Sequence, residues 1–151
     1  MEQNKLNEEL NQLLKGTHMG ASIFEDLYDK VKSEKLKNEF HEILDKFRLH
    51  ERSLTSLIMA NDGEAADTAG VKGTITDMMY KIKNVMITND KQVLDEAVKC
   101  MEGAQKALHD FQGRHKILAD NVEKVIHIMQ DDYGTIYHTL HKYLIEFEKM
   151  D

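Results

Sequence analysis

The chain has 151 residues, the size of one folded domain, and its 27 Asp and Glu against 20 Lys and Arg give a formal charge of −7 at pH 7. Its basic residues are interspersed with acidic ones, and no apolar run approaches the roughly 18 residues that a membrane-spanning helix requires, so we expect neither nucleic acid nor membrane as a partner. The absence of proline and the abundance of Leu, Lys, Glu and Met predict an all-α protein with a single domain over residues 1–151.

The first part of the chain predicts two long antiparallel helices, because apolar or small residues recur in steps of four and three. On the first helix these are Leu6, Leu10, Leu13, Thr17, Gly20, Phe24, Leu27 and Val31, and on the second Leu36, Phe40, Ile43, Phe47, His50, Leu54 and Leu57. The short charged break at residues 32–35 folds the second helix back beside the first. Three positions on this face are small or polar, and there such a bundle would place a functional site: Thr17, Gly20 and His50.

The middle of the chain decides the topology. Residues 61–73 form a polar connector, and residues 74–87 predict a short amphipathic helix that begins at Thr74. At 1.5 Å per residue this helix covers roughly 20 Å, enough to carry the chain back along the bundle. If the segment crosses from one end to the other, the second and third long helices run parallel, which is typical of ferritin-like bundles.

Two further long helices complete the prediction. The third is capped by Asn89 or Asp90, and residues 112–115 form the turn that follows it. Its inward positions are Leu94, Ala97, Met101, Ala104, Leu108 and Phe111. The last helix covers residues 116–148 with inward positions Leu118, Val122, Val125, Met129, Asp132, Ile136, Leu140 and Leu144.

Cys100 is the only cysteine, so no internal disulfide can form, and we expect a reducing, cytoplasmic location. The first residues lack the basic and apolar regions of a secretory signal. The apolar neighbours of Cys100 favour a buried structural thiol over a reactive one.

The eight histidines are candidate ligands for a metal site. Di-iron bundles use carboxylates from two helices and Glu-x-x-His pairs from the other two. None of the eight histidines has Asp or Glu three residues before it. The residues at those positions are Lys15, Asn38, Phe47, Lys106, Gln112, Lys124, Thr135 and His138. The spacing therefore argues against an intact di-iron site, and leaves open a ligand at another spacing or from another subunit.

Other histidine patterns have competing interpretations. His50 lies on the buried face, where a hydrogen bond to a neighbour such as Thr17 is favoured over metal ligation. The last helix carries a stripe that could bind a transition metal, but flanking lysines favour a solvated face. The stripe consists of His127, Asp131, His138 and His141.

Four segments carry a resemblance to a known family: residues 10–19, residues 34–40, the His50-x-x-x-Leu54 pattern, and residues 101–104, which read Met-Glu-Gly-Ala. They resemble an uncharacterised ferritin-like family that is described only as a domain of unknown function, and the likeness covers almost the whole chain. The resemblance implies a ferritin-like four-helix bundle with a long crossover that contains one short extra helix. It also implies candidate metal ligands at the bundle centre, which many relatives carry.

Most of those ligands are replaced in this chain. Where members typically read Gly-Glu-x-Met in the first helix, this chain has Thr17 after the glycine, and the Asp-His-x-x-His of the second helix has become a segment with Phe47 and His50. The Gly-Glu of the third helix ends in Ala104, and the Asp-Glu-x-His of the fourth keeps only His138. Every matched carboxylate is lost, so divalent ions would lack compensating charge, and we expect a degenerate site filled with neutral side chains.

We therefore expect a non-catalytic structural or protein-interaction module that binds no cofactor and self-associates as a homodimer or other homo-oligomer. The alternative is a divergent oxidoreductase or storage protein for iron or manganese. Its candidate ligands are His18, His50, His138, Glu25, Glu51 and Asp132. A third alternative with less support is a hemerythrin-like di-iron site, suggested by His41-x-x-x-Asp45.

Overall fold

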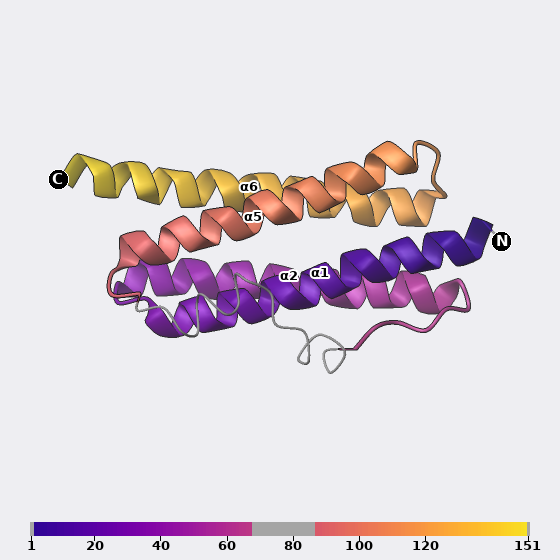
Figure 1. The fold of residues 1–151 in the computed structure, drawn as a ribbon, viewed down its shortest axis with the longest axis horizontal. Helices are drawn as coiled ribbons and strands as arrows, with labels where there is room; N and C mark the ends of the chain where they lie inside the picture. Colours follow the sequence, from indigo (N-terminus) through magenta and orange to yellow (C-terminus); the bar gives the residue numbers. More distant parts are fainter. Residues whose placement is uncertain (1, 68–86, 151) are drawn as a thin grey trace.

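The computed structural model describes residues 2–67 and 87–150, which form a bundle of four long helices (Figure 1). These are α1 (Glu2–Lys30), α2 (Glu34–Ala60), α5 (Asp90–Arg114) and α6 (Asp120–Met150). The remaining described residues are turns and extended segments, so the all-α prediction is confirmed. The short helix expected over residues 74–87 lies outside the described residues except for residue 87, as does the second half of the 61–73 connector.

Helix α5 begins at the end of the bundle where α1 ends. The side chain of Asp90 accepts hydrogen bonds from the backbone N–H groups of Lys32 and Ser33 at 2.8 and 3.0 Å. At the opposite end, His115 follows α5 and contacts Glu9 near the start of α1. Helix α5 is therefore antiparallel to α1 and parallel to α2, and the chain between α2 and α5 leads from one end of the bundle to the other. The predicted crossing is confirmed.

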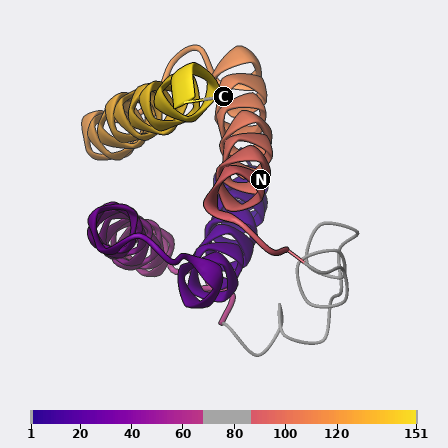
Figure 2. The ribbon, with the colours of Figure 1, turned by 90° about the vertical axis from the view of Figure 1, so that its left-hand side faces the viewer.

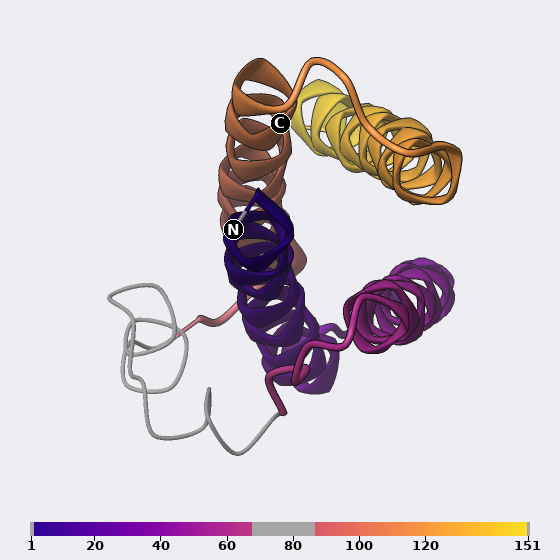
Figure 3. The ribbon, with the colours of Figure 1, turned by 90° about the vertical axis from the view of Figure 1, so that its right-hand side faces the viewer.

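Seen along the bundle axis, the four helices occupy the corners of a square, with α2 beside α1 and α6 beside α5 (Figure 2, Figure 3). Helix α1 also packs against α5, and α2 against α6. Each helix thus has two neighbours and turns one face to the centre. None of the described helices combines the length and apolarity needed to cross a membrane.

The centre of the bundle is apolar along its length. The largest fully buried side chains are Phe24, Phe40, Phe47, Phe111, Leu10, Leu14, Leu27, Leu36, Leu54, Ile58 and Leu94. The ring of Phe24 lies between two others, and its centroid is 5.4 Å from that of Phe40 and 5.3 Å from that of Phe47. The inward faces predicted from the helical period are largely those observed. Six of the predicted inward residues are only half-buried: Leu6, Ala104, Leu118, Val125, Asp132 and Leu144.

The predicted turn between the last two long helices lies too early in the chain. Helix α5 continues to Arg114, because the N–H of His115 still donates to the carbonyl of Phe111 at 3.0 Å. Helix α6 begins at Asp120 rather than at residue 116, and the N–H of Glu123 donates to the carbonyl of Ala119 at 2.9 Å at this start. The connection therefore covers residues 115–119.

The chain leaves α2 through a Schellman motif. The N–H of Gly63 donates to the carbonyl of Ile58 at 2.9 Å, and the N–H of Asp62 donates to that of Met59 at 3.1 Å. Asp62 has a φ of 58°, in the left-handed region where glycine is the usual residue. This turn sends the chain back along α1.

The first part of the connector is held by asparagines on α1. Asn7 Nδ2 donates to the carbonyl of Asn61 at 3.1 Å. Asn11 donates to the carbonyl of Glu64 and accepts from the N–H of Ala66, both at 2.8 Å. The backbone polar groups of this extended segment therefore find partners on the helix beside it.

Candidate functional site

An aromatic ring fills the middle of the bundle. Phe47 of α2 is fully buried, and its ring centroid lies 5.8 Å from that of Tyr133 on α6. On α1, a Cβ added at Gly20 would lie only 2.6 Å from the Phe47 ring, so the ring needs glycine there. Thr17, also buried, donates its hydroxyl to the carbonyl of Leu13 at 2.8 Å. Thr17 and Phe47, both expected to be inward and neutral, are buried as predicted.

Beside this ring, a buried histidine is paired with a carboxylate. His50 is 1% exposed, and its Nε2 lies 2.7 Å from Oδ2 of Asp132 on α6. Burial lowers the pKa of His50, and the hydrogen bond to Asp132 opposes that shift. With Nε2 donating to the carboxylate, Nδ1 is left as an acceptor that has no hydrogen-bond partner among the described residues. The prediction that His50 is a buried histidine hydrogen-bonded to a neighbour is confirmed. The neighbour is Asp132 and not Thr17, whose hydroxyl donates to its own helix.

Two other buried groups near the bundle centre, the Tyr133 phenol and the Cys100 thiol, are uncharged at neutral pH. Tyr133 is 3% exposed, and burial raises the pKa of its phenol. Burial also raises the pKa of the Cys100 thiol to about 12. Cys100 is buried, as expected, and its thiol is uncharged at neutral pH.

A second polar cluster lies between α1 and α2 and reaches the connector. Nδ1 of His18 contacts the buried carboxylate of Glu51, and Nε2 of His18 lies 3.0 Å from the carbonyl oxygen of Ala66. Arg48 Nη1 donates to the other oxygen of Glu51 at 3.1 Å, and Arg48 also pairs with Glu25. One network of polar contacts thus includes three of the candidate ligands, His18, Glu51 and Glu25. Through His18 it also contacts the backbone of residue 66.

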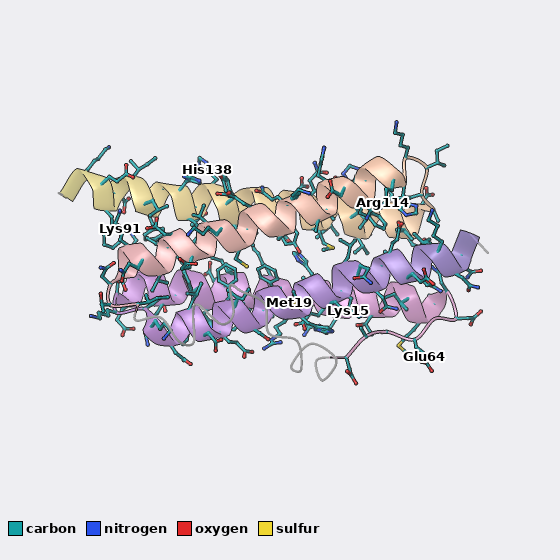
Figure 4. The ribbon with its side chains drawn as sticks, in the orientation of Figure 1. Lys15, Met19, Glu64, Lys91, Arg114 and His138 are labelled. Carbon is teal, nitrogen blue, oxygen red and sulfur yellow. The ribbon has the colours of Figure 1, made fainter. Side chains whose placement is uncertain are left out.

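The remaining candidates lie on the surface. His138 is exposed on the outer side of α6 (Figure 4). His127 and Asp131 are exposed too, as the solvated-face interpretation predicts, while His141 is half-buried. His41 and Asp45 form an exposed pair at 3.6 Å. These side chains do not join the central pair.

The six candidate ligands therefore do not converge. His50 pairs with Asp132, His18 pairs with Glu51, and Glu25 reaches this second pair only through Arg48. Across residues 2–67 and 87–150, no group of three or more His, Cys, Asp or Glu is placed to hold a metal ion. At the bundle centre, one free histidine nitrogen and one carboxylate stand beside an aromatic ring. That donor set does not fit a two-metal cluster, which needs several carboxylates to balance its charge.

Tyr133 is the central residue that the sequence did not single out as a candidate. Its position gives a signal, because it stands seven residues from both Ile126 and Leu140 on the buried face of α6. What the helical period cannot give is the ring that Tyr133 packs against, because Phe47 belongs to another helix.

The family match agrees with the resemblance to a domain of unknown function. The family model described as "Domain of unknown function (DUF2383)" matches residues 5–116. The chain belongs to the DUF2383 family. The match includes α1, α2, the crossover and α5, and it ends before α6 begins, so Asp132 and Tyr133 lie beyond it. A search of curated proteins found no match to the chain.

Proposed function

We propose that the chain is a ferritin-like bundle whose metal centre has been replaced by packed neutral side chains, and that it serves in the cytoplasm as a non-catalytic, self-associating structural or interaction module. The parallel arrangement of α2 and α5, joined by a long crossover, supports the ferritin-like assignment. Membership of the DUF2383 family is compatible with this assignment and indicates no activity.

The burial of Phe47 carries the proposal. Its ring lies against Phe24 and Tyr133, with centroids 5.3 and 5.8 Å away. Gly20 leaves the space that the ring occupies. A metal cluster at this level would have to displace an aromatic side chain that is fully buried, and Thr17 and Ala104 would supply no negative charge.

The alternative is a divergent iron or manganese protein, and one observation favours it. Nδ1 of His50 is buried and has no hydrogen-bond partner among the described residues, so it is available to an ion or a water molecule. Asp132 would supply the nearest carboxylate.

Metal analysis of the purified protein separates the two functions. We expect protein from cells grown with added iron and manganese to contain far less than one metal ion per chain, and its melting temperature to be the same with and without a chelator. A content close to two ions per chain, lost in His50→Ala but retained in His138→Ala, would contradict the proposal and establish the alternative.

Exposed apolar side chains support the self-association part. Leu49 on α2 and Ile128 and Ile145 on α6 are 47%, 44% and 50% exposed. Sedimentation equilibrium of the whole chain is expected to show a homo-oligomer that Leu49→Glu or Ile128→Glu weakens. A wild-type chain that remains monomeric at high micromolar concentration would contradict self-association.

A further inference from the structure

A cavity of about 330 Å³ lies between α1 and α5. The central His50–Asp132 pair, by contrast, joins α2 to α6. Its walls include Gly16, Gly20 and Ile23 from α1, and Gly103 and Ala104 from α5. The small side chains on both helices leave the space between them unfilled.

Packing explains only one of these glycines. Gly20 is required because a Cβ there would meet Phe47. A Cβ at Gly16 or at Gly103 meets nothing within 4 Å. Each of these glycines costs its helix about 1 kcal/mol relative to alanine, and no neighbouring side chain in the described structure repays that cost.

The floor of the cavity carries polar groups. Tyr133 and Thr17 line it together with Cys100. Cys100 is 8% exposed, and its thiol has no hydrogen-bond partner among the described residues. An unpartnered, buried thiol next to a buried phenol gives the cavity a polar end that a bound molecule can contact.

These floor groups are uncharged at neutral pH, and this restricts the ligand. A charged group placed there would lose its hydration without gaining an ionic partner. The cation at the rim, Lys99, is exposed and already lies 3.6 Å from the carboxylate of Glu96. The other polar side chain of the lining, Gln12, is exposed, and the remaining walls are apolar. The chemistry that fits is therefore a neutral, mainly apolar molecule with few hydrogen-bonding groups.

The volume sets the size of that molecule. An apolar cavity of about 150 Å³ holds one benzene ring, so about 330 Å³ accommodates a molecule of one or two rings. A docking helix, which is about 10 Å across with its side chains, does not fit within this space. We propose that the α1–α5 cavity binds one neutral, mainly apolar small molecule of one- or two-ring size, with its polar group toward Tyr133 and Cys100.

Indole, a neutral two-ring compound with one N–H donor, is a suitable probe for the full-length chain. Binding is measured by calorimetry, and occupancy is measured independently by the rate at which a neutral maleimide alkylates Cys100, the only thiol in the chain. We expect indole to bind the wild type and to slow this alkylation severalfold.

The test variant is Gly103→Leu, which places an isobutyl group in the open space of the cavity. The matched control is Gly134→Leu, because a Cβ at Gly134 of α6 also meets nothing within 4 Å and this residue does not line the cavity. Both changes add the same side chain to a helix, so they share the gain in helix propensity. We expect Gly103→Leu to weaken indole binding at least about tenfold, and Gly134→Leu to bind as the wild type does.

Three outcomes would overturn the proposal. They are no binding of indole to the wild type up to its solubility limit, equal binding to Gly103→Leu, and binding that leaves Cys100 alkylation unchanged. If Gly103→Leu fails to fold by circular dichroism, Gly16→Leu replaces it as the test. If indole does not bind and Gly103→Leu or Gly16→Leu dissociates an oligomer that the wild type forms, a second copy of the chain covers this face. The small-molecule site is then wrong.

Discussion

Asp90, the first residue of α5, accepts a hydrogen bond from the backbone N–H of Lys32 at 2.8 Å, and so ties the start of α5 to the turn between α1 and α2. The same carboxylate accepts a second bond from the N–H of Ser33 at 3.0 Å. Asp90 is 9% exposed, so these N–H groups have limited access to water as a substitute partner. One side chain thus links the start of α5 to the backbone between α1 and α2.

Asp90→Ala is expected to lower the free energy of unfolding by about 2–4 kcal/mol, because it leaves two backbone donors without their partner. Urea denaturation followed by circular dichroism measures the loss. The control is Asp131→Ala on the exposed face of α6, which should change stability by less than about 0.5 kcal/mol. Equal losses in the two variants would show that the Asp90 contacts contribute nothing specific.

Acidification should destabilise the protein through His50. Its pKa is lowered in the folded state by burial, so between pH 7 and 5 the unfolded chain binds more protons than the folded one. Stability is therefore full above the unfolded pKa of about 6.5, and falls as the pH drops below it by at most about 1.4 kcal/mol per pH unit from this group.

His50→Gln should flatten this pH dependence, because glutamine does not titrate and its amide can still donate to Asp132. Unfolding free energies measured from pH 7.5 to pH 5 test the difference in slope. His138→Gln, a change of the same kind at an exposed position, should leave the wild-type slope unchanged. A wild-type slope that persists in His50→Gln would assign the effect to other groups.

Two glycines one helical turn apart should respond to alanine with opposite signs. Gly16→Ala is expected to stabilise the fold by about 1 kcal/mol, because its Cβ enters open space and alanine favours helix. Gly20→Ala is expected to destabilise it by about 1–3 kcal/mol, because its Cβ would lie 2.6 Å from the Phe47 ring. Thermal and urea unfolding of the two variants provide the comparison, and a stabilising Gly20→Ala would mean that the ring moves away at little cost.

The left-handed residue after α2 offers a stabilising change. Asp62 has a φ of 58°, so Asp62→Gly should raise the free energy of unfolding by about 1 kcal/mol, whereas Asp62→Ala should bring no such gain. Gly63→Ala should be destabilising, because its Cβ would lie 2.8 Å from Nδ2 of Asn7 and 2.9 Å from Cγ2 of Ile58. Urea unfolding of the three variants tests this ordering.

Placing acids at the bundle centre should lower stability. Glutamates introduced together at Thr17, Phe47 and Ala104 are expected to lower stability by several kcal/mol in the absence of metal, with most of the loss from the two fully buried positions. Thr135→Glu on the exposed face of α6 controls for the added charge. A triple variant that melts at the wild-type temperature would mean that these positions reach water.

The helices and their inward faces could be predicted from the sequence because both depend on neighbours within a few residues. The steps of three and four that include Thr17, Phe47 and His50 place these residues inside, and all three are buried. Helix N-caps are local in the same way, because the side chains of Ser33 and Asn89 accept hydrogen bonds from the backbone N–H groups three residues later.

The partners of those inward residues were decided only by the tertiary structure. His50 and Asp132 are 82 residues apart in sequence, and the helical period that places each inside does not say which side chain faces which. Asp90 at the start of α5 contacts the Lys32 backbone across 58 residues of sequence, which no local pattern indicates. The cavity between α1 and α5 likewise exists because small residues on two separate helices come to lie opposite each other. Local periodicity fixes which face of a helix is buried, whereas contacts across the bundle depend on how all the helices pack together.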